Sequence, residues 1–159
     1  MNDYKYYLDY GIYDFQSGKF SDAIEKFNQS LELKNDWEIP YFYRGAANHA
    51  LGNLDEAILD YTKALEFNDK MIDAYYNRAK ILLERKDIKN PDINRAVNDL
   101  EKALELDSNF IDALFAMAAA QKKLENYNEA LKFLDKLLEI QPDSIHAKAL
   151  KKLILNKYL

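Results

Sequence analysis

Apolar residues along this chain recur at helical spacing, and four segments repeat nearly the same order of apolar and polar positions. One copy, NLDEAILDYTKALEFND, runs from Asn53 to Asp69. Each copy has an alanine just before its first aliphatic residue, and these alanines, Ala23, Ala57, Ala96 and Ala130, follow one another at intervals of 34, 39 and 34. A period of this length predicts an array of helix pairs, because one pair cannot bury both of its apolar faces alone.

A small residue inside a bulky helical run precedes each segment, at Gly11, Gly45, Ala79 and Ala118. Counted from this small residue as position i, the following alanine is at i+12 in repeats one, two and four, but at i+17 in repeat three. Each repeat is therefore predicted to be two helices joined by a short turn, with five extra residues, Lys86 to Asn90, in the third. We expect this insertion to bulge at the surface. Loop closure costs only about 0.6 kcal/mol per doubling of loop length, so its deletion should leave the melting temperature nearly unchanged.

Residues that favour turns lie where the two helices of a pair should meet. Gly18 and Gly52 suit the C-terminus of a first helix, and Ser21 and Asp55 are the predicted N-caps of the second helices. Pro40 fits the first turn of a helix, where its missing N–H has no helical partner.

These repeats resemble the tetratricopeptide repeat family, a 34-residue helix–turn–helix unit with the pattern W-x2-L-G-x2-Y, then A-x3-F, then P. The residues that carry the resemblance are Tyr7, Tyr10, Gly11, Ala23 and Phe27, then Tyr41, Arg44, Gly45, Ala57 and Tyr61, then Tyr75, Arg78, Ala79, Ala96 and Leu100, then Leu114, Met117, Ala118, Ala130, Leu134 and Pro142. The pattern's tryptophan is missing, and the first three repeats lack its final proline.

The resemblance implies an all-α fold, a right-handed superhelical α-solenoid of four helix–turn–helix repeats with a C-terminal capping helix. The repeats fall at about residues 4–37, 38–71, 72–110 and 111–144, and the capping helix at 145–159, in a single domain that spans residues 1–159. The cap is predicted from one apolar helical face made of Ile145, Ala149, Leu150, Leu153 and Ile154.

The N-terminal end has no matching cap. Tyr6, Tyr10 and Tyr13, at i, i+4 and i+7, would face the place where a preceding repeat packs. Exposure to solvent is one interpretation of this stripe, because the tyrosine hydroxyl stays hydrated. The other is self-association through the terminal repeat, which makes a structural, self-assembling subunit the alternative function.

Composition narrows the class of protein. With 48% hydrophobic residues, the 159-residue chain is too apolar for disorder. Its net charge of −5 argues against general binding to nucleic acid or to anionic membranes, which need a basic surface. The absence of cysteine excludes disulfides, zinc–thiolate sites and thiol catalysis. The chain has neither a signal-peptide pattern nor an apolar run long enough to span a bilayer, so we expect a cytoplasmic protein.

Candidate chemistry is sparse. His49 and His146 lie on different repeats, without the ligand spacing that zinc needs. Acidic residues lie at helical spacing among lysines, which indicates a solvated face. No phosphate loop, dinucleotide fingerprint, zinc-protease or nucleophile-elbow motif occurs. We therefore expect no enzyme activity, no cofactor and no metal.

The family resemblance points instead to an inner groove lined by the first helix of each pair, which binds a peptide or a helix of a partner. The groove positions carried over to this chain are Leu8, Ile12, Phe42, Tyr43, His49, Tyr76, Asn77, Lys80, Phe115 and Lys122, together with Phe15, Ala46, Leu83 and Ala119. Each aromatic residue taken alone could equally be core packing. As a set, they predict an adaptor or scaffold that binds an apolar or amphipathic segment of a protein partner.

One subclass of the family clamps the C-terminal carboxylate of a chaperone with Lys, Asn, Asn, Lys and Arg. The corresponding positions here are Leu8, Ile12, Tyr43, Asp73 and Asn77 on the first three repeats, or Phe42, Ala46, Asn77, Asp112 and Ala116 on the last three. Only Asn77, in the second placement, matches, and the aspartates would repel a carboxylate. The resemblance therefore predicts that this chain does not bind chaperone tails.

Overall fold

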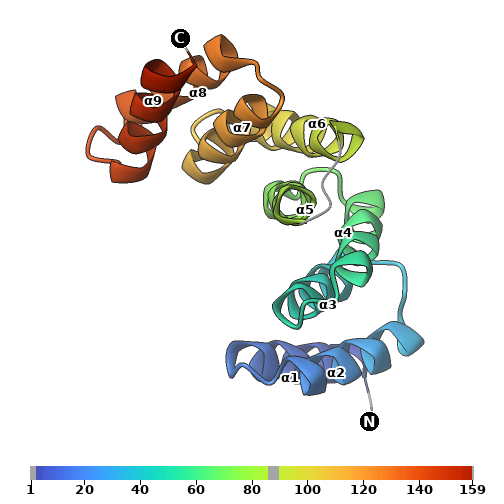
Figure 1. Ribbon diagram of the computed structural model, residues 1–159. Helices are drawn as coiled ribbons and strands as arrows, with labels where there is room; N and C mark the ends of the chain where they lie inside the picture. Colours follow the sequence, from blue (N-terminus) through green and yellow to red (C-terminus); the bar gives the residue numbers. More distant parts are fainter. Residues whose placement is uncertain (1–2, 86–89, 159) are drawn as a thin grey trace. The chain divides into compact units, whose positions relative to one another are not determined.

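The computed structural model describes residues 3–85 and 90–158, and every regular element in these ranges is an α-helix (Figure 1). The helices are α1 (Tyr4–Gln16), α2 (Phe20–Leu33), α3 (Glu38–Ala50), α4 (Leu54–Phe67), α5 (Ile72–Glu84), α6 (Asn90–Leu106), α7 (Ile111–Lys123), α8 (Tyr127–Ile140) and α9 (Ile145–Lys157). They form successive pairs followed by one more helix, so the predicted all-helical repeat fold is confirmed. No helix among these residues is long and apolar enough to cross a bilayer.

The chain divides into two compact units, Met1–Ile81 and Leu82–Leu159, which we call the N-terminal and C-terminal units. The boundary falls near the end of α5. The N-terminal unit holds α1 to α4 and most of α5, and the C-terminal unit holds α6 to α9. Each unit has core clusters of its own, so the packing of each one is described separately.

The helices of a pair meet at the small residues that the sequence pattern identified. Gly11 lies against the ring of Phe27, and Gly45 lies against Asp60 and Tyr61. In the C-terminal unit, Ala118 and Leu134 share one core cluster. Close approach of the backbones is possible because these positions carry little or no side chain.

The turns within pairs confirm the predicted glycines and correct the predicted caps. Gly18 and Gly52 adopt positive φ angles of 75° and 81°, which glycine tolerates without steric cost. However, α2 and α4 begin at Phe20 and Leu54, each one residue before the predicted N-cap, so the assignment of Ser21 and Asp55 was wrong. The preceding Lys19 and Asn53 are the N-caps, and neither makes a side-chain capping bond. The predicted capping bonds are therefore not needed to start these helices.

Two other predictions concern the loops. Pro40 lies in the first turn of α3, as predicted. The insertion Lys86 to Asn90 falls largely outside the described residues, which resume at the start of α6. Its surface position and the small effect of its deletion therefore stay predictions.

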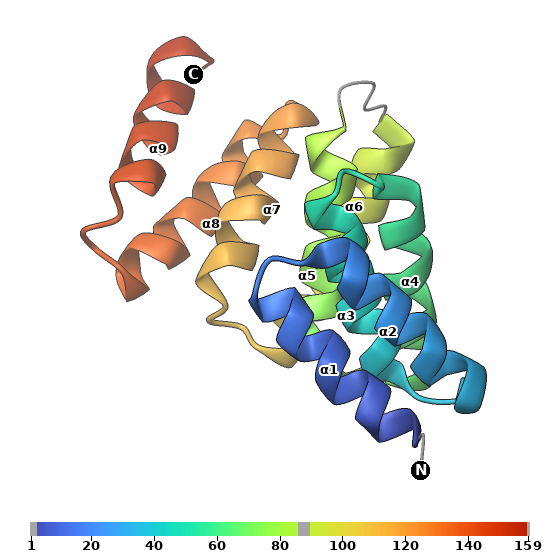
Figure 2. The ribbon, with the colours of Figure 1, turned by 90° about the horizontal axis from the view of Figure 1, so that it is seen from below.

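The last helix packs beside α8 (Figure 2), but only in part through the predicted face. Ala147 and Ile154 are fully buried, whereas Ile145 is 78% exposed and Leu153 is 42% exposed. The prediction of the apolar face was therefore right for Leu150 and Ile154, which pack on this cluster, and wrong for Ile145, Ala149 and Leu153, which are exposed. Two stripes at helical spacing run along this short helix, and α8 is covered by the one that contains the small Ala147, which permits close approach.

Candidate functional site

A row of aromatic rings crosses from α1 to α3 in the N-terminal unit. The ring centroids of Phe15 and Tyr43 are 5.8 Å apart, and those of Tyr43 and Phe42 are 5.5 Å apart, both with edge-to-face geometry. Phe20 extends the row beyond Phe15 at 5.6 Å, and Tyr61 extends it beyond Phe42 at 5.7 Å. We call Phe15, Tyr43 and Phe42 the aromatic row. All three are half-buried, so each presents part of its ring to solvent.

The inner side of the aromatic row rests on the core. Phe42 packs against the cluster that contains Tyr61 and Ile81, and Tyr43 packs against the cluster that contains Leu8 and Phe27. The sequence left core packing and surface exposure as alternatives for these rings. In the structure, each ring both packs on the core and is partly exposed. Leu8 itself belongs to the core and is 7% exposed, which leaves a ligand little of it to touch. Ile12 is half-buried beside it.

Polar groups lie on the neighbouring predicted positions. His49 on α3, and Tyr76 and Asn77 on α5, are half-buried, while Lys80 is exposed. Burial raises the pKa of the Tyr61 phenol, a side-chain hydrogen bond with Asn77 opposes the rise, and the charge of Asp60 adds to it. That hydrogen bond ties Asn77 to Tyr61, whose ring lies next to Phe42 of the aromatic row.

The remaining two predicted groove residues lie in the C-terminal unit. Phe115 is half-buried and packs against the cluster of Leu114, Ala118 and Leu134. The ammonium group of Lys122 lies 5.9 Å from the ring centroid of Tyr158, at the end of α9. A cation–π contact therefore already engages this lysine.

A polar network that the groove prediction did not include holds α3 against both of its neighbours. The Arg44 guanidinium donates from Nε and Nη2 to the Asp60 carboxylate at 2.9 and 2.6 Å, and from Nη1 to Asn28 Oδ1 at 2.7 Å. Asn48 Nδ2 donates to the same carboxylate at 3.2 Å. Because Asn28 lies on α2 and Asp60 on α4, the network joins the first two pairs.

A sequence signal for this network exists. Arg44 and Arg78 lie one repeat apart, at equivalent places of α3 and α5. Arg78 Nη1 donates to Thr62 Oγ1 at 2.9 Å, and Thr62 precedes Arg78 by the same 16 residues that separate Asn28 from Arg44. The second part of that signal is an aspartate in the middle of an apolar helix face, as at Asp60. The structure shows that this aspartate is buried, where a charge needs a partner.

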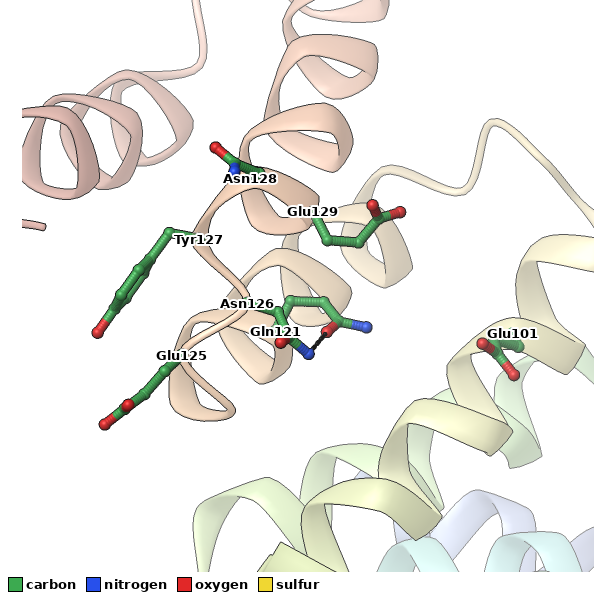
Figure 3. A pocket seen from close by; sticks show the side chains of 7 residues that line it. All are labelled: Glu101, Gln121, Glu125, Asn126, Tyr127, Asn128 and Glu129. Atoms are coloured by element: carbon green, nitrogen blue, oxygen red, sulfur yellow. Dashed lines mark hydrogen bonds between the residues drawn. The ribbon is translucent and has the colours of Figure 1, made fainter. Parts of the chain in front are cut away.

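An open depression in the C-terminal unit lies at the turn between α7 and α8 (Figure 3). Three glutamates, Glu101, Glu125 and Glu129, line it together with amide side chains. Figure 3 shows that these carboxylates point in different directions, and the hydrogen bond from Asn126 to Gln121, 2.9 Å long, closes the turn. No group of acidic, histidine or cysteine side chains in the described part of the chain could hold a metal ion. The depression is therefore a feature of the turn, without converging ligands.

The predicted tyrosine stripe lies at the surface of α1. Tyr6, Tyr10 and Tyr13 are 48%, 50% and 63% exposed. The ring centroids of Tyr6 and Tyr10 lie 4.6 Å apart, so these two rings form one exposed aromatic surface.

Comparison with known proteins adds the family and the fold. A family model described as "Tetratricopeptide repeat" matches residues 88–154, and one described as "TPR repeat" matches residues 47–85. Heat shock protein STI1 of Saccharomyces cerevisiae is 44% identical over 50 residues, which are 31% of this chain and 8% of that protein. The chain spans 8 to 13% of the length of the curated relatives it matches.

Solved structures share the fold at low sequence identity. The crystal structure of MamA has a TM-score of 0.81 and 24% identity, over 89% of this chain and 80% of that one. The first TPR of Spaghetti (RPAP3), bound to HSP90 peptide SRMEEVD, has a TM-score of 0.66 and 24% identity, over 72% of this chain and 87% of that one. The helix pairs, their packing at small residues and the two family models agree. The chain therefore belongs to the tetratricopeptide repeat family.

Proposed function

We propose that this chain is a non-enzymatic adaptor that binds an apolar or amphipathic segment of a partner protein over the aromatic row. Tetratricopeptide repeats mediate protein–protein interactions, and the solved relative with a bound HSP90 peptide is one case. The observation that carries the proposal here is the continuous line of half-exposed rings across the first two pairs. The lack of cysteine suits an adaptor of a reducing compartment such as the cytoplasm.

The chemistry of this surface favours an amphipathic occupant over a purely polar one. Half-buried rings whose inner side is fixed by the core lose little conformational entropy when a ligand covers them. Asn77, which is hydrogen-bonded to Tyr61 next to Phe42, offers a polar group beside the rings that can set the direction of a bound segment. An occupant that places apolar side chains on one face and polar groups on the other fits both parts of the surface.

A charge placed in the middle of the surface tests this proposal. Ala46 is half-buried on α3 and packs beside Phe42. We expect Ala46→Glu to weaken the binding of peptides selected from a displayed random library by about 1–3 kcal/mol, because a carboxylate desolvated against rings opposes an apolar anchor. Isothermal titration calorimetry with the selected synthetic peptides measures the change.

Leu59→Glu is the matched control, because Leu59 is 67% exposed on α4 and receives the same added charge outside the aromatic row. It should bind the peptides as the wild type does. Tyr76→Ala and Phe42→Ala should weaken binding while circular dichroism shows a folded protein. Equal affinities for the wild type and Ala46→Glu would show that the peptides bind elsewhere.

A chaperone tail is expected to bind poorly, in spite of the similarity to heat shock protein STI1. On the first three repeats, the clamp positions include the buried Leu8 and the exposed, acidic Asp73. The peptide SRMEEVD carries three acidic side chains and a C-terminal carboxylate, which these residues cannot neutralise. Calorimetric titration should give a dissociation constant no tighter than about 1 mM. A constant near about 1 µM would contradict the prediction, and the same peptide without its last residue controls for binding through the carboxylate.

A further inference from the structure

The third, seventh and tenth residues of α3, α5, α7 and α9 lie on one face of each helix. At the third place, Pro40 of α3, Ala74 of α5, Ala113 of α7 and Ala147 of α9 are all buried. At the tenth place, Ala47, Ile81, Ala120 and Ile154 are all buried too. In α1 these two places hold Tyr6 and Tyr13, which are exposed, and the seventh holds Tyr10, also exposed.

Contacts at the seventh place show what normally covers this face. Arg44 of α3 reaches Asn28 on α2, and Lys151 of α9 forms an ion pair with Asp135 on α8. In each case the partner lies on the second helix of the preceding pair. We call Tyr6, Tyr10 and Tyr13 the tyrosine face. It has the position of a helix-covered surface and the composition of an interface, since tyrosine is enriched where surfaces associate.

The net charge of the first repeat, which carries the tyrosine face, favours a basic occupant. Residues 1–37 contain seven acidic residues and four lysines, a net charge of −3. The opposite end of the chain has the complementary charge, because residues 145–159 contain four lysines and no acidic residue, a net charge of +4. Two α1 helices facing each other would bring together like charges such as those of Asp9 and Asp14.

The outer side of α9 offers the matching surface. Ile145, Lys148, Lys152 and Leu155 lie at i, i+3, i+7 and i+10 and are all exposed, on the side away from the buried Ala147 and Ile154. We call these four residues the lysine face. Lysine stems and the two aliphatic residues can cover tyrosine rings, while the ammonium groups lie over their π faces. This chain already uses that contact: Lys34 lies 5.1 Å from the ring centroid of Tyr4, and Lys157 lies 5.3 Å from that of Tyr158.

We propose that the occupant of the tyrosine face is a second copy of this chain, which docks the lysine face of its α9 there. The contact joins two different surfaces, so it is heterologous and leaves one tyrosine face and one lysine face open at the ends of a dimer. The association therefore grows with protein concentration. It weakens as salt rises, because exposed charges are screened over about 10 Å at 0.1 M salt.

Sedimentation velocity on the full chain tests this inference. From about 10 µM to 1 mM protein in about 20 mM salt, the average mass should rise above the 18.6 kDa of one chain, and it should fall back at about 300 mM salt. Tyr6→Ala/Tyr10→Ala removes one face, and Lys148→Glu/Lys152→Glu removes the other. Each variant alone should stay monomeric, but an equimolar mixture should form a 1:1 dimer, because each supplies the face that the other lacks.

Three results overturn the proposal: a monomeric wild type at every concentration in low salt, a lysine-face variant that associates like the wild type, or a mixture of variants that stays monomeric. All four substituted side chains are exposed, and circular dichroism should show an unchanged helix content. Peptide binding over the aromatic row should be unaffected by either double variant, and Ala46→Glu should leave the association unchanged. The two proposals can therefore fail separately.

Discussion

Arg44→Met is expected to lower the free energy of unfolding of the N-terminal unit by about 3 kcal/mol. The substitution keeps most of the aliphatic stem but leaves the Asp60 carboxylate, whose side chain is 7% exposed, without its guanidinium. Removing one partner of a buried ion pair typically costs about 3–5 kcal/mol. The low end applies here because the Arg44 side chain is 23% exposed and Asn48 still donates to Asp60. Urea unfolding followed by the fluorescence of Trp37, which packs in this unit, measures the loss.

Two further variants separate the buried charge from the lost side chain. Arg44→Met/Asp60→Leu removes both charges and should be less destabilised than Arg44→Met alone, because no unpaired carboxylate then remains in the core. Lys63→Met breaks the exposed pair of Lys63 with Glu66 and should leave the urea midpoint nearly unchanged, because solvent screens an exposed pair. If Arg44→Met unfolds at the wild-type urea concentration, the network does not hold the first two pairs together.

The helix pairs could be predicted from the sequence because their signal repeats. The interval between Ala23 and Ala57 recurs between the starts of α1, α3 and α5, which are Tyr4, Glu38 and Ile72. Packing at Gly11 and Gly45 follows from the same period, since a small residue at one place in each repeat indicates close contact.

Details that depend on side-chain geometry could not be predicted. The N-caps lie two residues before the predicted ones, because backbone hydrogen bonds from Ala23 to Lys19 and from Ala57 to Asn53 close the first turns without Ser21 or Asp55. The buried face of α9 was predicted only in part, because the sequence does not show whether Ala147 or Ala149 lies against α8. The sequence also does not show that a ring such as Phe42 is partly buried. It packs against the core and is still partly exposed to solvent.

Gly11→Ala is expected to destabilise the N-terminal unit by about 2–3 kcal/mol, although alanine is the better helix former. A methyl group at Gly11 would lie 2.6 Å from Cε1 and 2.8 Å from Cδ1 of Phe27. The Phe27 ring is fully buried, so it cannot move aside without displacing the residues packed around it. At Gly45 the nearest atom, Cβ of Asp60, would be 3.2 Å away, and Gly45→Ala should cost less.

The repeats themselves indicate the compensating change. Glycine pairs with a ring in the first two pairs, at Gly11 with Phe27 and at Gly45 with Tyr61, whereas Ala118 shares its cluster with Leu134. Gly11→Ala/Phe27→Leu should therefore be more stable than Gly11→Ala alone, because the smaller side chain makes room for the methyl group. Urea unfolding of the two single variants and the double variant gives the coupling energy. If the losses of the single variants simply add, steric contact with Phe27 is not the reason for glycine at this position.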